Sequence, residues 1–110
     1  MPGAVEPQYL YLTTLGRRSG LPREIEIWFT RRHGRDYVIS EHWGQANWVR
    51  NLLAQPRVRW RVGQTTVSGQ ARALDAAADA GLVQEIQQLS RKKYDWGEGL
   101  VVELTPDPPS

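Results

Sequence analysis

The chain has 110 residues, a length typical of one small domain with a single hydrophobic core. Hydrophobic residues make up 40% of it and charged residues 24%, a balance that excludes a disordered chain. The net charge of +2 is too small to indicate bulk nucleic-acid binding. Cysteine is absent, which excludes disulfides, a thiol nucleophile and a cysteine-ligated metal.

The ends of the chain carry neither a recognisable signal sequence nor a long apolar run. A membrane-spanning helix needs about 20 apolar residues, and no stretch of this sequence approaches that. We therefore expect a cytoplasmic protein without a membrane span. Residues 1–110 are expected to form one domain, with residues 1–7 and 105–110 flexible because both segments are rich in proline.

Three strands are predicted in the first part of the chain, over residues 9–14, 24–30 and 36–40. The middle one alternates strictly, which places two sets of side chains on opposite faces of the sheet. Glu24, Glu26 and Trp28 form one set, and Ile25, Ile27 and Phe29 form the other.

The second part of the chain mixes helices and strands. Apolar residues four apart predict a helix over residues 45–54, which Pro56 ends. Two alternating strands follow over 57–62 and 65–74, and Asp75 is a suitable N-cap for a second helix. Its predicted buried face consists of Leu82, Val83, Ile86 and Leu89, and residues 100–104 form the last strand. This order favours a mainly β, α+β fold: a small barrel or curled sheet with two helices outside.

The segment from Thr13 to Arg23 (TTLGRRSGLPR) is a hairpin turn with two glycines, a serine and three arginines. Glycines let backbone amides converge, and guanidinium groups add planar sets of donors, so such a turn can hold a phosphate or carboxylate. On spacing alone, the alternative is that glycine and serine make the turn while the arginines are solvated. The pattern is neither a Walker loop nor a dinucleotide-binding motif.

This turn resembles the TTxGRxSGxPR motif of the deazaflavin-dependent nitroreductases, a branch of the flavin-binding split-barrel superfamily. A second motif, Trp48 to Pro56 (WVRNLLAQP), is similar to the W..NL.A.P helix of that family. The similarity runs from about residue 11 to residue 74. It implies an FMN-binding-like split β-barrel of about six strands with two peripheral helices, and it implies the deazaflavin coenzyme F(420) as cofactor, with FMN as the alternative.

The resemblance also implies a cofactor site. The turn would face the phosphate and acidic tail of the coenzyme, through Gly16, Arg17, Arg18, Ser19 and Arg23. The strand after the turn would lie against the ring, through Glu26, Ile27 and Trp28. The alternative for this strand is a barrel exterior on which its acids are merely solvated. Trp48 is expected in the core, and Asn51 is expected to be local scaffolding.

Four further side chains are candidates for the ring or substrate site. His42 and Trp43 occupy a loop that is shorter than the corresponding loop of the family, and either ring could contact the cofactor. Tyr94 and Trp96 precede the last strand and could contact substrate. His42 and Tyr94 are the candidate proton donors, although His42 could equally be a surface or capping residue and Tyr94 could pack against the barrel. Two histidines without a pattern of nearby acids do not make a metal site.

The predicted function is hydride transfer from a reduced deazaflavin to a quinone or nitroaromatic acceptor, because the cofactor carries the hydride and the protein orients it. One alternative is an FMN- or haem-binding protein on the same barrel. Another is a nucleic-acid-binding small barrel that stacks bases on Trp43 and Trp60. Glu24 and Glu26 beside the basic turn argue against nucleic acid, since they would repel phosphates. The expected partners are therefore a small-molecule cofactor and an electron acceptor.

The arginines at 57, 59 and 61 share one face of their predicted strand. Such a row is usually solvated, but it could line a ligand path or a dimer groove. The chain has five tryptophans, more than a core of this size needs, and aromatic and arginine side chains are typical of interface centres. We therefore expect a homodimer, with a monomer whose tryptophans line only the cofactor pocket as the alternative.

Overall fold

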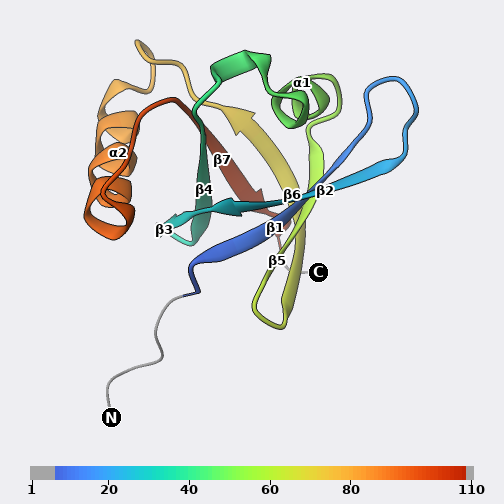
Figure 1. Cartoon of the computed structure of the whole chain (residues 1–110), viewed down its shortest axis with the longest axis horizontal. Coiled ribbons are helices and arrows are strands. Elements are labelled where there is room, and N and C mark those ends of the chain that lie inside the picture. Colours follow the sequence, from blue (N-terminus) through green and yellow to red (C-terminus); the bar gives the residue numbers. More distant parts are fainter. Residues whose placement is uncertain (1–6, 109–110) are drawn as a thin grey trace.

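Seven strands form one curled antiparallel sheet in the computed structural model, which describes residues 7–108 (Figure 1). The sheet order is β2-β1-β5-β6-β7-β4-β3. The strands are β1 Tyr9–Leu15, β2 Pro22–Trp28, β3 Thr30–Arg32, β4 Arg35–Ser40, β5 Arg57–Val62, β6 Thr65–Ala73 and β7 Leu100–Pro106. A 3₁₀ turn η1 (Trp43–Gln45) and two helices, α1 (Asn47–Ala54) and α2 (Ala80–Tyr94), complete the fold. The mainly β split barrel with two helices is confirmed, with seven strands in place of six.

The additional strand arises from a break at Phe29, where the chain changes partner. Residues up to Trp28 pair with β1, and from Thr30 onward the chain pairs with β4 at the opposite edge of the sheet. The Tyr94 hydroxyl accepts the Phe29 N–H at 3.1 Å, and Lys93 Nζ donates to the Phe29 carbonyl at 2.8 Å. The single predicted strand over residues 24–30 is therefore wrong, because groups more than sixty residues away satisfy the backbone at the break.

The interior of the barrel is lined by the apolar residues of the alternating strands, including Leu10, Leu12 and Trp60. Leu52 of α1 joins this core, so the helix closes one end of the barrel. Trp60 is only 1% exposed, and its indole N–H donates to the buried carboxylate of Asp36 at 2.9 Å. This burial excludes Trp60 as a platform for stacking nucleic-acid bases.

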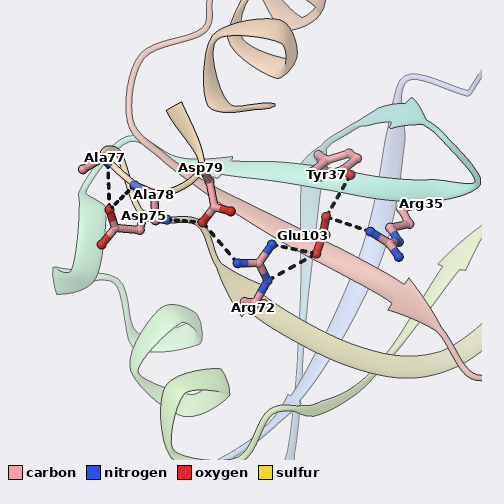
Figure 2. Close-up of polar contacts among 8 residues, drawn as sticks. All are labelled: Arg35, Tyr37, Arg72, Asp75, Ala77, Ala78, Asp79 and Glu103. Carbon is pink, nitrogen blue, oxygen red and sulfur yellow. Dashed lines mark hydrogen bonds and ion pairs between the residues drawn. The ribbon is translucent and has the colours of Figure 1, made fainter. Parts of the chain in front are cut away.

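The second helix, α2, covers the outer face of β4 and β7 and forms a second core there (Figure 1). Ile86 is its fully buried residue. The Asp75 carboxylate accepts the N–H groups of Ala77 and Ala78 at 2.7 and 2.8 Å, as in an N-cap (Figure 2). It caps a single turn, however, and the helix itself begins only at Ala80 and continues through Tyr94.

The C-terminal strand β7 is longer than the strand predicted over residues 100–104. Residues 105 and 106, expected to be flexible, continue β7 and pair with β6. Gly69 allows this pairing, because a Cβ there would collide with the backbone of Thr105. Arg57 also forms an ion pair with Asp107. The same prediction also covers residues 1–6 and 109–110, which lie outside the described residues. No helix within residues 7–108 is long and apolar enough to cross a membrane.

Candidate functional site

The turn between β1 and β2 is closed by its own backbone. The Gly16 N–H donates to the Leu21 carbonyl, and the Gly20 N–H donates to the Gly16 carbonyl, both at 2.8 Å. The Leu21 N–H donates to Ser19 Oγ at 3.1 Å. Gly20 has a φ of +71°, a region that favours glycine. A Cβ on Gly16 would lie only 2.6 Å from Ser19 Oγ, so both glycines are needed for this compact turn.

Helix α1 holds the start of this turn through an asparagine. Asn51 Oδ1 accepts the Arg17 backbone N–H at 3.2 Å and the Arg17 Nη1 at 2.9 Å. Asn51 Nδ2 donates to Thr14 Oγ1 at 3.2 Å. Asn51 is therefore more than local scaffolding, since it joins the helix to segments 34 and 37 residues earlier in the chain.

A cavity of about 500 Å³, called the turn cavity below, lies between this turn and α1. All five turn residues proposed from the sequence line it, together with Ile25, Asn47, Trp48 and Asn51. Three guanidinium groups thus surround one hollow. Among the described residues that line it there is no acid, so the turn cavity can take a phosphate or carboxylates.

A second cavity of about 510 Å³, the strand cavity, occupies the split of the barrel between β2 and the end of β4. Its aromatic wall includes Trp28, Trp48 and Trp96. Trp48 also lines the turn cavity, so the two cavities adjoin at this indole. Trp48 is half-buried and packs against the barrel core, so it is both a core residue and a wall of the cavities.

The strand cavity also carries titratable groups. Glu26 accepts a hydrogen bond from the Tyr11 hydroxyl at 2.7 Å, and this bond raises the pKa of Tyr11 above its ordinary value. At the other side, His42 Nε2 lies 3.3 Å from Glu41 Oε1. The side chains of Glu41 and His42 are 64% and 74% exposed and line the same cavity as the tryptophans, an arrangement suited to an aromatic ligand that exchanges a proton.

The structure brings most of the proposed site residues together. Glu26, Ile27, Trp28 and His42 line the strand cavity, and the five turn residues line the adjoining one. Trp43 is 54% exposed and lines neither cavity.

Tyr94 is likewise not among the residues that line the strand cavity. Its ring stacks on Trp28, with ring centroids 4.5 Å apart, and its hydroxyl bonds to the backbone of Phe29 and Gln8. Tyr9, which no sequence motif singles out, lines the strand cavity together with Ser40, because the closure of the barrel brings β1 and β4 there.

A family model of the F(420)H(2)-dependent quinone reductases matches residues 3–99 of the chain. The chain belongs to this family. As a member of the F(420)H(2)-dependent quinone reductases it is an oxidoreductase that uses reduced deazaflavin, as the two sequence motifs indicate. The FMN and haem alternatives are thereby set aside in favour of coenzyme F(420).

Solved structures confirm the barrel. An F(420)-H2 dependent reductase is 17% identical and covers 96% of this chain and 100% of its own, with a TM-score of 0.74. A FAD-binding protein from Mesorhizobium loti is 16% identical, with a TM-score of 0.74; the match covers 92% of this chain and 82% of that protein. A haem-binding protein from Mycobacterium smegmatis is 18% identical, with a TM-score of 0.70; the match covers 93% of this chain and 47% of that protein.

These neighbours bear the names of three different cofactors, so the shared fold does not select the cofactor; the family match does. Among curated proteins, none matches this chain.

Proposed function

We propose that the two cavities form one continuous cleft for the deazaflavin coenzyme, with its phosphate and acidic tail in the turn cavity and its ring in the strand cavity. The observation that carries this proposal is that Trp48 lines both. Arg17, Arg18 and Arg23 at one end suit anions, and the aromatic wall at the other end suits a planar ring. The donor set of this chain therefore fits both parts of the coenzyme.

The reduced coenzyme supplies a hydride, and the residues of the strand cavity have to place the acceptor and complete its reduction. Trp28 and Trp96 would bind a quinone ring against the coenzyme and exclude water from it. A quinone that receives a hydride also needs one proton to become the neutral hydroquinone. We assign that proton to the His42 imidazole, which lines the cavity and is of the side-chain type most able to exchange a proton near neutral pH. Glu41, at 3.3 Å, would steady the protonated ring.

The proposed orientation is tested by comparing the complete coenzyme with a deazaflavin that lacks the phosphate and tail. Raising the salt concentration is expected to lower the affinity for the complete coenzyme several-fold, because its tail contacts exposed arginines. The affinity for the tail-less ligand should stay nearly unchanged. Fluorescence titrations of both ligands at low and high salt measure this. Equal salt dependence for the two ligands would contradict the placement of the tail in the turn cavity.

We further propose that the protein forms a homodimer through the outer face of β2, β1 and β5. Register places Glu26, Tyr11 and Arg61 side by side on these strands, and Glu24, Thr13 and Arg59 likewise. Acids on β2 and arginines on β5 thus flank β1. The two copies would pack face to face, related by a two-fold axis that runs parallel to β1 and lies between them. Each acidic row would then face the arginine row of the other copy, which gives a self-complementary interface.

Sedimentation equilibrium at micromolar concentration is expected to give twice the chain mass of 12.5 kDa. Reversing Arg59 and Arg61 together to Glu should dissociate the dimer, because acids would then face acids. Adding an equal amount of a variant that carries both Glu24→Lys and Glu26→Lys should restore mixed dimers. A single species of chain mass for the unaltered protein would refute the dimer.

A further inference from the structure

We propose that Asn51 is a positioning residue: its side-chain amide sets the direction of Arg17 in the turn cavity while leaving the positive charge of Arg17 available to the tail of the coenzyme. This inference rests on the function proposed above, since it concerns how the turn cavity holds its anion. It assigns Asn51 a role in cofactor affinity that is exerted through Arg17.

The side chain of Asn51 is buried and makes three hydrogen bonds. The residue is 5% exposed, and its Oδ1 accepts two N–H groups of Arg17, one from the backbone and one from the guanidinium. Its Nδ2 donates to the hydroxyl of Thr14, which is fully buried. Thr14 near the end of β1, Arg17 of the turn and helix α1 are therefore joined at one amide.

The guanidinium of Arg17 is fixed at two points. Nη1 is held by Asn51, and Nη2 lies 3.5 Å from Oδ1 of Asn47, one helical turn earlier on α1. A guanidinium has five N–H donors, so these contacts leave others for a ligand. Because the long side chain is already ordered, binding an anion costs less conformational entropy than it would for a free arginine.

The neutrality of Asn51 matters as much as its geometry. An aspartate in the same place could accept both Arg17 N–H groups, and the Thr14 hydroxyl could turn to donate to it. That carboxylate would also pair with the guanidinium and cancel its charge toward the tail. An amide is thus the side chain that orients Arg17 without competing with the anion.

The test is a double-mutant cycle on cofactor affinity, measured by fluorescence titration with the complete coenzyme and with the tail-less deazaflavin. Asn51→Ala is expected to lower the affinity for the complete coenzyme about tenfold and the affinity for the tail-less ligand less than about twofold. In an Arg17→Ala background, Asn51→Ala should change the affinity for the complete coenzyme by less than about twofold, because its effect passes through Arg17. Gln55→Ala is the matched control and should cost less than about twofold, since this exposed amide at the end of α1 does not line the turn cavity.

Hydrogen exchange of the Arg17 backbone amide gives a second readout that does not depend on the ligand. Protection should be lost in Asn51→Ala and retained in Asn51→Asp, although Asn51→Asp should still weaken the complete coenzyme by charge cancellation. If Asn51→Ala does not fold, Asn51→Ser takes its place in the cycle under the same criteria.

Three results would overturn the inference: equal losses for the two ligands, multiplicative effects of the Asn51 and Arg17 substitutions, or unchanged protection of the Arg17 amide in the alanine or serine variant. If Arg17→Ala itself leaves the coenzyme affinity unchanged, the turn cavity is not the tail site and the proposed function fails with it. If Arg17→Ala weakens binding but the cycle is multiplicative, only the role of Asn51 fails.

Discussion

Replacing Arg17 and Arg18 together by alanine is expected to weaken binding of the deazaflavin coenzyme by about tenfold or more, because two charge-assisted hydrogen bonds to the tail are lost. The fold should survive, since both side chains are exposed on a turn. Titration of the coenzyme measures the loss, and the melting temperature shows whether the barrel is intact.

The matched control for this double variant is Arg32→Ala combined with Arg91→Ala. It removes the same charge from two exposed arginines that line neither the turn cavity nor the proposed dimer face. Affinity should fall far less in the control. Equal losses in the two double variants would mean that only the net charge of the protein matters, and unchanged affinity in the Arg17 and Arg18 variant would remove the turn from the site.

A large loss of stability is expected for Glu103→Ala. Glu103 is 4% exposed on β7, and its Oε2 accepts the Tyr37 hydroxyl at 3.0 Å and Arg35 Nη1 at 3.3 Å (Figure 2). Arg72 donates to Oε1 from Nε and Nη2 at 3.4 and 3.3 Å. Burial, reinforced by the bond to Glu103, raises the pKa of Tyr37 to about 12, so Tyr37 stays a neutral donor in the folded protein.

Removing this carboxylate is expected to lower the free energy of unfolding by about 3 kcal/mol, since it leaves a buried hydroxyl without its acceptor. Arg35 and Arg72 are about half exposed, and water can take over their hydrogen bonds, which keeps the loss from being larger. Urea unfolding measures the loss. Glu98→Ala is the control, because that carboxylate is 76% exposed in its ion pair with Arg91, so its loss should cost less than about 1 kcal/mol. A Glu103 variant as stable as the Glu98 variant would refute this assignment.

The parts of the fold that could be predicted are those governed by local pattern. The alternation in β2 placed Ile25 and Ile27 on the face opposite Glu24 and Glu26, and in the structure both isoleucines pack against the barrel core. The Gly-Arg-Ser turn could be recognised because its conformation depends on its own residues. The same short segment predicted that its arginines gather around a site for an anion, and in the structure they line the turn cavity.

The features that could not be predicted depend on residues far apart in the sequence. The buried carboxylates of Asp36 and Glu103 are stabilised by groups from other strands, and no local pattern reveals such partners. The break at Phe29 depends on Tyr94 and Lys93 of α2. Trp48 fits the pattern of a core residue equally well, and only the split of the barrel makes it part of the site.

The central claim is that this chain transfers a hydride from a reduced deazaflavin held in the paired cavities. The most direct measurement is an anaerobic single-turnover experiment in which the protein, loaded with the reduced coenzyme, is mixed with a quinone. The account predicts rapid oxidation of the coenzyme in step with formation of the hydroquinone, with reduced FMN giving little reaction under the same conditions. Rapid turnover with reduced FMN, and none with the reduced deazaflavin, would contradict it.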